Sequence, residues 1–147
     1  MDNGIVLKKL TIEDYEKIVS LWKEAGLPFK PKGRDSKEEI KRQMEENPEF
    51  FLGAFMDDEL VGVVIGSYDG RMKGWINRLA VSPRFRRKGI AKMLVCEMER
   101  ILSSKGAKIF CVLVEKPNPA SINLFKKLGY ALHENIVYMT KRESQEV

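Results

Sequence analysis

In one stretch of the sequence, a predicted strand, a basic loop and a long amphipathic helix follow one another directly. The strand covers residues 74–81, the dipeptide Ser82-Pro83 ends it, and Gly89 stands where the loop passes into the helix. The first amides of a helix have no partner within the helix, and the helix dipole favours an anion at that end. Glycine leaves room for a ligand because it carries no Cβ. The stretch therefore predicts a sheet with helices on its faces and a cradle for an anion, most naturally a pyrophosphate.

The same loop carries the net positive charge of the chain. The 147 residues include 26 Lys and Arg against 21 Asp and Glu, which gives a net charge of +5. Residues 84–92 contain no acid, and without them the chain is formally neutral. The bases in this segment are Arg84, Arg86, Arg87, Lys88 and Lys92. A nucleic-acid binder usually spreads its bases over a face, so one tight cluster favours a small polyanion, with a solvated basic loop as the alternative.

Length and composition indicate one globular domain over residues 1–147. Hydrophobic residues make up 44% and charged residues 32%, which excludes a chain that is disordered throughout. No apolar run approaches the roughly 20 residues needed to cross a bilayer, and the amino terminus has no secretory layout. Cys96 and Cys111 lie within apolar patterns, so we expect no disulfide framework and a cytoplasmic protein without membrane contact. His133 is the only histidine, and we therefore expect no metal site.

Hydrophobic spacing and turn residues predict ten elements in the order β-α-α-β-β-β-α-β-α-β. Strands are expected at residues 4–10, 50–56, 60–68, 74–81, 108–114 and about 134–140. Helices are expected from Thr11 to Gly26, from Ser36 to Asn47, from the end of the basic loop to Gly106, and from Pro119 to Gly129. The apolar runs 60–66 and 108–114 are the candidates for central strands, since such strands are covered on both faces. The order predicts an α/β (α+β) fold with a mixed sheet.

Two blocks of the sequence resemble the signatures of the GNAT family of N-acetyltransferases. Residues 86–91 (RRKGIA) resemble its R/Q-x-x-G-x-G/A loop, which in the family holds the coenzyme A pyrophosphate. Further along the chain, residues 118–130 (NPASINLFKKLGY) resemble its second block, N-x-x-A-x-x-L-Y-x-x-x-G-F/Y. Within the family, residues 60–92 look most similar to the YpeA-type bacterial acetyltransferases. The resemblance implies a single GNAT domain, with a mixed, mostly antiparallel sheet of six to seven strands and about four helices.

The resemblance also implies acetyl-CoA as co-substrate and indicates where it binds. The main chain of residues 79–81 would pair with the pantetheine arm as an added strand does, and residues 86–92 would wrap the pyrophosphate. Asn118 matches the family's asparagine near the pantetheine, and it also reads as the N-cap of the helix that begins at Pro119; the two roles are compatible. The implied cofactor-binding residues are Leu79, Ala80, Val81, Arg86, Arg87, Lys88, Gly89, Ile90, Ala91, Lys92, Asn118 and Phe125.

The expected reaction is direct transfer of acetyl from the thioester to an amine, which requires mainly alignment and a donor to the developing oxyanion. The family's usual acid and base positions are not matched, because Phe125 replaces a tyrosine acid, and Asn77 and Leu113 occupy two base positions. Glu115 is the nearest carboxylate, on the expected strand face of Leu113, and is the candidate base. The alternative is a solvated glutamate, with water carrying protons. Three tyrosines are candidate proton donors or packing residues: Tyr68, Tyr130 and Tyr138.

Three functions are consistent with these observations. The first is an acetyl-CoA-dependent N-acetyltransferase, monomeric or homodimeric, that acts on a primary amine of a peptide amino terminus, a lysine or a small molecule. The second is a non-catalytic module that binds or senses acyl-CoA, which the unmatched acid and base positions favour. The third is a small nucleic-acid binder, which the confinement of the charge to one cluster disfavours. Where the family places its substrate-gating loop, Lys30, Lys32 and Arg34 indicate either an acceptor with acidic groups or a solvated loop.

Overall fold

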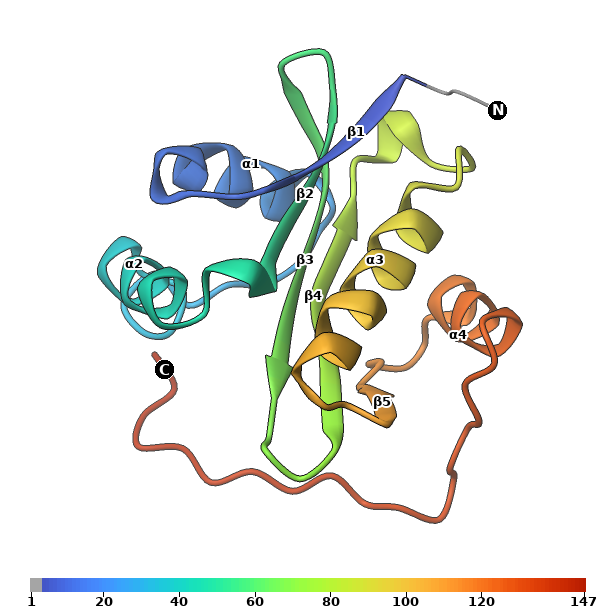
Figure 1. Cartoon of the computed structure of the whole chain (residues 1–147). Helices are drawn as coiled ribbons and strands as arrows, with labels where there is room; N and C mark the ends of the chain where they lie inside the picture. Colours follow the sequence, from blue (N-terminus) through green and yellow to red (C-terminus); the bar gives the residue numbers. More distant parts are fainter. Residues whose placement is uncertain (1–3) are drawn as a thin grey trace.

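The computed structural model describes residues 4–147, in which five strands form one sheet in the order β1-β2-β3-β4-β5 (Figure 1). Neighbouring strands are antiparallel except β4 and β5, which are parallel. The strands are β1 (Ile5–Lys9), β2 (Phe51–Met56), β3 (Glu59–Tyr68), β4 (Lys73–Val81) and β5 (Ile109–Val112). The helices are α1 (Tyr15–Glu24), α2 (Lys37–Glu46), α3 (Ile90–Lys105) and α4 (Pro119–Lys127). The 3-10 segments are η1 (Ile12–Asp14), η2 (Pro48–Phe50) and η3 (Pro83–Phe85).

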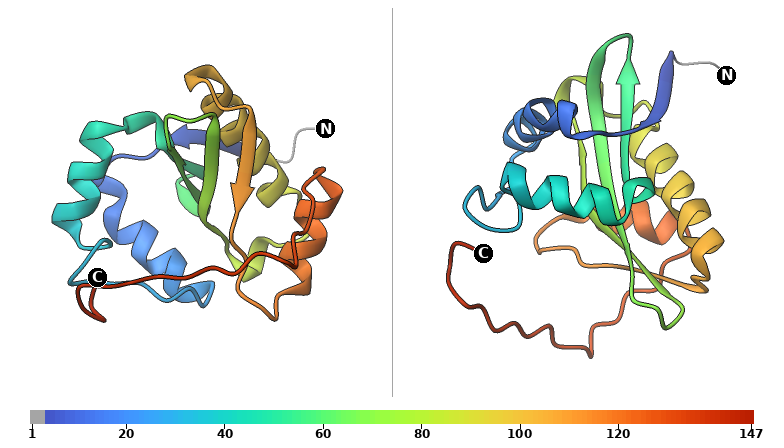
Figure 2. Two further views of the ribbon diagram at one scale, coloured as in Figure 1. Left: turned by 90° about the horizontal axis from the view of Figure 1, so that it is seen from below. Right: turned by 60° about the vertical axis from the view of Figure 1, so that its left-hand side comes forward.

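Helices cover both faces of the sheet, with α1 and α2 on one side and α3 and α4 on the other (Figure 2). Helix α3 packs closely on β3 and β4 because glycines face it. A Cβ added at Gly62 would lie 2.9 Å from Cγ2 of Ile90, and one added at Gly74 would lie 2.9 Å from Cδ1 of Leu102. These positions therefore admit the helix only because they carry no side chain.

The helix ends follow the local signals in the sequence. The Oγ of Ser36 accepts a hydrogen bond from the backbone N of Glu39 at 3.2 Å at the start of α2, and Oδ1 of Asn118 accepts one from the backbone N of Ser121 at 3.1 Å at the start of α4. Gly106 adopts a left-handed φ of 115° and ends α3. The predicted caps at these three positions are confirmed.

The sheet has five strands within residues 4–147, not the expected six to seven, because the strand predicted at about 134–140 is not formed. Residues 131–147 instead form an extended segment that leads away from α4 and past the end of the sheet (Figure 1). Val137 and Met139 in this segment are 79% and 84% exposed. A strand needs a ladder partner for its backbone as well as apolar side chains. The observed order of elements therefore lacks the last strand of the predicted order.

Of the two strands predicted to lie in the centre of the sheet, one does and the other does not. The prediction for residues 60–66 is confirmed, since β3 lies in the middle of the sheet. The prediction for residues 108–114 is wrong, because β5 is a short edge strand that pairs only with β4. Ile109 and Leu113 are 50% and 55% exposed. The apolar run lines an opening beside the sheet and is not covered on both faces.

That opening arises where β4 and β5 separate. Strand β5 pairs with β4 only as far as Ile76, and the rest of β4 to Val81 has no ladder partner on that side among the described residues. On its other side β4 carries a bulge, at which Arg78 and Leu79 together oppose one residue of β3. Arg78 has a φ of 52°, a left-handed conformation that residues with a side chain rarely adopt. The bulge and the gap are neighbouring features of the same strand.

Candidate active site

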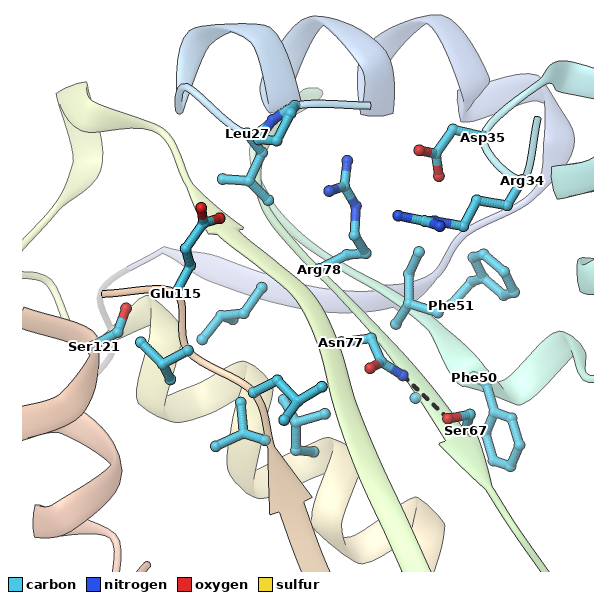
Figure 3. Close-up of a pocket in the computed structure, with 18 of the residues that line it drawn as sticks. Leu27, Arg34, Asp35, Phe50, Phe51, Ser67, Asn77, Arg78, Glu115 and Ser121 are labelled. Carbon is cyan, nitrogen blue, oxygen red and sulfur yellow. Dashed lines mark hydrogen bonds between the residues drawn. The ribbon is translucent and has the colours of Figure 1, made fainter. Parts of the chain in front are cut away.

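The opened end of the sheet borders a cavity of about 1060 Å³ (Figure 3). The bulge of β4 contributes Asn77, Arg78 and Leu79 to its lining. Residues 112–118 line it on the β5 side, and residues of the loop after α1 line it on the other side. Concave sites of this size with mixed polar and apolar walls are typical of small-molecule binding.

The loop that follows β4 forms the predicted turn into a helix. Ser82 is fully buried, and its Oγ accepts a hydrogen bond from the backbone N of Arg84 at 3.3 Å at the start of η3. Arg87 and Gly89 have positive φ values of 65° and 79°, and α3 begins at Ile90. A Cβ built on Gly89 would meet no heavy atom within 4 Å, so the space in front of this glycine is open. The start of α3 is thus an accessible helix N-terminus of the kind that binds phosphate groups.

Four of the five bases in this segment remain at the turn, and the fifth does not. The four are Arg86, Arg87, Lys88 and Lys92, and all five bases of the segment are exposed. Arg84 binds two carboxylates of other elements: its Nε donates to Oε2 of Glu24 in α1 at 3.0 Å, and its Nη2 donates to Glu59 in β3. These two hydrogen bonds raise the pKa of the Arg84 guanidinium above its already high ordinary value. Arg84 is therefore already engaged by two carboxylates of the protein itself.

Residues 79–81 lie on the part of β4 that has lost its β5 partner. Ala80 and Val81 pair with β3, and Leu79 lines the cavity. The opposite edge of these residues faces the gap, where no ladder partner occurs among residues 4–147. Main-chain groups on this edge can therefore pair with an extended ligand.

Asn118 and Phe125 both line the cavity from α4. Asn118 caps the helix through Oδ1, and its amide nitrogen takes no part in the cap. Phe125 is 4% exposed, and its ring packs edge-on against the ring of Tyr130 with 4.9 Å between centroids. The hydroxyl of Tyr130 donates to Oε2 of Glu99 at 2.6 Å, and burial together with this carboxylate raises the pKa of the phenol. Tyr130 is therefore bound to α3 and serves packing.

Glu115 lines the cavity but does not lie on a strand. Because β5 ends at Val112, the expected strand-face relation between Leu113 and Glu115 is absent, although both residues line the cavity. Glu115 is exposed, and its side chain extends toward the side of the cavity where Leu27 lies (Figure 3). Asn77, which stands at another family base position, donates from Nδ2 to Oγ of Ser67 at 3.1 Å.

The other two candidate tyrosines also line the cavity. The Tyr68 hydroxyl accepts a hydrogen bond from the backbone N of Met72 at 3.3 Å at the turn between β3 and β4. Tyr138 is 68% exposed and belongs to the extended carboxyl-terminal segment. That segment reaches the loop after α1, where Nζ of Lys30 donates to the carbonyl O of Gln145 at 2.6 Å.

The structure adds Arg78 and Asp35 to the site, which the sequence did not indicate. Asp35 is 4% exposed, and its Oδ2 accepts a hydrogen bond from the backbone N of Lys30 at 2.8 Å. The guanidinium carbon of Arg78 lies 4.3 Å from the centroid of the Trp22 ring. Burial lowers the pKa of Arg78, while the nearby Asp35 carboxylate acts in the opposite direction. The only sequence signal for Arg78 is that it is a charged residue in the mostly apolar run 74–81.

Comparison with known proteins identifies the family. The family model described as Acetyltransferase (GNAT) family matches residues 15–130. This chain belongs to the GNAT family of acetyltransferases. The GNAT chain is 32% identical over 136 residues to an acetyltransferase of Sodalis glossinidius, which covers 91% of this chain and 94% of that protein. It is 34% identical over 131 residues to an acetyltransferase of Photorhabdus laumondii, which covers 88% and 90% of the two chains.

A solved structure extends the comparison to a bound ligand. The PaiA N-acetyltransferase of Thermoplasma acidophilum, solved in complex with coenzyme A, superimposes on this GNAT protein with a TM-score of 0.78 and 26% identity. The superposition covers 92% of this chain and 94% of that one. Within residues 4–147, no helix of the GNAT protein is long and apolar enough to span a membrane, and no group of three or more His, Cys, Asp or Glu side chains could hold a metal ion.

Proposed function

We propose that this GNAT protein is an acetyl-CoA-dependent N-acetyltransferase that transfers the acetyl group to a primary amine by direct attack in a ternary complex. The observation that carries the proposal is the gap between β4 and β5. The unpaired edge of β4 in this gap leads from the cavity beside Arg78 to the glycine turn before α3. A long, thin thioester laid along this edge would reach the turn with its phosphates and the cavity with its acyl group.

The cofactor would be held mainly by main-chain groups. Its pyrophosphate would lie on residues 86–92, where the first amides of α3 and the exposed bases meet the open space at Gly89. Its pantetheine arm would pair with residues 79–81 as an added strand does. Asn118 and Phe125 would face the arm from α4, the first through its amide nitrogen and the second through its ring.

The reaction needs little covalent chemistry from the protein, because a thioester is already activated. The amine nitrogen attacks the carbonyl carbon, the carbon–sulfur bond breaks, and coenzyme A leaves as a thiolate that takes up a proton. A main-chain N–H of β4 at the bulge would stabilise the developing oxyanion. The attacking amine gives up a proton, and we assign its acceptance to Glu115, through water because this carboxylate is exposed on the cavity wall.

We further propose that residues 1–147 act as a single acetyltransferase domain of the YpeA type, in the cytoplasm and as a monomer or homodimer. The similarity of residues 60–92 to that group supports the subclass, and the single sheet supports the domain. The acceptor would be the amine of a peptide amino terminus, a lysine or a small molecule.

The test is to mix the purified protein with acetyl-CoA and a panel of primary amines and to follow thiol release with a thiol-reactive dye. Mass spectrometry identifies the acetylated product, and calorimetry measures coenzyme A binding separately. We expect both binding and amine-dependent thiol release. Binding without release for any amine would favour a non-catalytic acyl-CoA-binding module, which the phenylalanine at position 125 supports. Failure to bind coenzyme A would overturn both functions, and a fully active Glu115→Ala enzyme would remove Glu115 as the base.

A further inference from the structure

Arg78 presents unpaired hydrogen-bond donors beside the cavity. It occupies the bulge of β4, and its side chain points to the α1 side of the cavity (Figure 3). The guanidinium stacks on the ring of Trp22, and its Nε and Nη2 are buried without a hydrogen-bond partner among residues 4–147. Nearly all buried polar atoms in proteins are paired, so two unpaired donors on one charged group indicate an acceptor from outside the chain. Nε and Nη2 also form the side-on fork with which arginine binds a carboxylate.

Two charged side chains of the loop after α1 face Arg78 (Figure 3). The exposed Arg34 directs its guanidinium toward Arg78, and the buried Asp35 lies next to both. One oxygen of Asp35 is already engaged by the backbone N of Lys30 at 2.8 Å. Two guanidinium charges against one carboxylate leave one positive charge uncompensated at this end of the cavity.

The other charged residues that line the cavity do not supply the missing anion. Glu49 pairs with Lys105, with 2.9 Å between its Oε1 and the lysine Nζ. Glu115 stands on the β5 side, away from Arg34 (Figure 3). Lys116 and Arg142 add further positive charge to the lining. The cavity therefore favours a ligand with a negative group near Arg78.

We propose that the acceptor amine carries a carboxylate, which Arg78 binds with Arg34 as a second donor. This inference rests on the proposed function and narrows its substrate class to amino acids or to peptides with an acidic side chain near the reacting amine. A carboxylate is a monoanion and matches the one positive charge that Asp35 leaves uncompensated between Arg34 and Arg78. Nε and Nη2 are shielded in the structure without ligand, so binding would require the Arg78 side chain or the neighbouring loop to move.

The position of Arg78 also connects the carboxylate with the reaction. Arg78 directly precedes Leu79, where the main chain of β4 would hold the acyl group. A carboxylate bound at Arg78 therefore keeps an amine of the same molecule close to the thioester. A polyamine is disfavoured, because its additional ammonium groups would face two guanidinium groups.

The test compares pairs of amines that differ only in this charge. L-methionine is compared with L-methioninamide, and a peptide amide that begins with aspartate is compared with one that begins with asparagine; spermidine serves as the polycation. The kcat/KM values from thiol release are expressed per unprotonated amine, because the amide and the acid differ in amine pKa. We expect the acid of at least one pair to be preferred about tenfold or more, with spermidine the poorest acceptor. A preference for methionine would identify the α-carboxylate of an amino acid as the bound group. A preference for the aspartyl peptide would identify a side-chain carboxylate.

Variants then assign the preference to Arg78. In Arg78→Gln, the KM for the preferred acid should rise about tenfold and the ratio of kcat/KM between acid and amide should fall toward one, while coenzyme A affinity stays at the wild-type value. Arg34→Gln should lower the same ratio less. Arg71→Gln, an exposed arginine at the turn between β3 and β4, is the matched control and should keep the wild-type ratio. If Arg78→Gln does not fold, as judged by its thermal unfolding, Arg34→Gln carries the test, since Arg34 lies exposed on a loop.

Equal use of acid and amide by an active wild-type enzyme would overturn the inference and leave the proposed function intact, as would an unchanged ratio in a folded Arg78→Gln. If no amine is acetylated, the proposed function fails. Calorimetric titration of each acid and its uncharged partner into protein saturated with coenzyme A then decides the inference separately. The inference is supported if the wild type binds an acid more tightly than its uncharged partner and Arg78→Gln loses this preference. It is overturned if the wild type binds both equally or binds neither.

Discussion

Gly89 and Arg78 both have left-handed backbone conformations, with φ values of 79° and 52°, but the consequences differ. Glycine adopts this conformation without steric cost, and the open space beside Gly89 is where a phosphate can approach the first amides of α3. Arg78 has a Cβ, so the same conformation costs roughly 1–3 kcal/mol, which the surrounding sheet must offset. Strain of this kind concentrates at functional sites, in agreement with the position of Arg78 beside the cavity.

Gly89→Glu should abolish coenzyme A binding and leave the fold intact. The new side chain would place a bulky anion where the phosphates are expected, and the left-handed φ adds local strain. Gly70→Glu is the matched control, because Gly70 has the same φ of 79° and equally open surroundings, at a turn that does not line the cavity. Calorimetry with coenzyme A and thermal unfolding of both variants provide the measurement. Wild-type affinity in Gly89→Glu would contradict the position assigned to the phosphates.

Among the helices and strands, the features set by a few neighbouring residues could be predicted from the sequence. The caps at Ser36 and Asn118 and the turn at Gly89 act within one turn of chain, so the helices and the basic loop were predicted in the right places. Strand pairing was harder, because residues 134–140 have a strand-like composition but α4 leads them past the sheet. Arg78 was missed for the same reason, since its orientation depends on a bulge in the register with β3.

The glycines beneath α3 provide a test of how this helix positions the phosphate turn. Gly62→Ala would bring a Cβ to 2.9 Å from the side chains of Ile90 and Leu94 at the start of α3. Gly74→Ala would create equally close contacts with Leu102 at the other end. Both variants should lower the free energy of unfolding by about 1–3 kcal/mol in urea denaturation. Only Gly62→Ala should also weaken coenzyme A binding, because it displaces the turn; equal affinities in both variants would contradict this.

The hydrogen bond from Tyr130 to Glu99 joins the end of α4 to α3 and makes stability depend on pH. The pKa of Tyr130 is raised above its ordinary value of 10.0, so the neutral phenol is favoured in the folded state. Its contribution is therefore fully present below pH 10 and is lost as the pH rises from there toward the folded pKa. Tyr130→Phe should lower the free energy of unfolding by about 1 kcal/mol at pH 8.

Urea denaturation over a series of pH values measures this effect. The stability advantage of the wild type over Tyr130→Phe should decrease near pH 10, with a slope that approaches about 1.4 kcal/mol per pH unit, and should reverse before about pH 11. Tyr138→Phe is the matched control, because Tyr138 is 68% exposed, and it should follow the wild type at every pH. A difference that stays constant from pH 8 to pH 11 would show that the hydrogen bond does not hold α4 on α3.

At the level of the whole molecule, the cavity is assembled from segments that are far apart in the sequence. The loop after α1, the bulge of β4 and residues 112–118 meet there, and Tyr138 and Arg142 of the carboxyl-terminal segment complete the lining. That segment contributes no strand and is held to the α1 side by the Lys30–Gln145 hydrogen bond and an exposed Lys32–Glu146 ion pair. Exposed pairs of this kind contribute little stability, so this part of the chain should open far more easily than the sheet.

Trypsin should therefore cleave the folded protein early at Lys141 and Arg142, which are exposed in the extended segment. The basic turn at residues 86–88 is also exposed and provides an internal comparison. Coenzyme A should slow cleavage at the turn, where we place its phosphates, and leave the rate at Lys141 and Arg142 unchanged. Intact-mass spectrometry over the digestion measures both rates.

The protein cleaved at Lys141 should keep its coenzyme A affinity and its thermal unfolding temperature to within about 4 °C, because it loses no strand or helix. The KM for the amine should change, because cleavage releases Arg142, which lines the cavity, together with the contacts that hold this segment to the loop after α1. Resistance of Lys141 and Arg142 to trypsin until the whole protein unfolds would contradict this view. Such resistance would indicate that residues 134–140 pair with an edge of the sheet, as their composition predicts. The cavity would then be more enclosed than it is when this segment is extended.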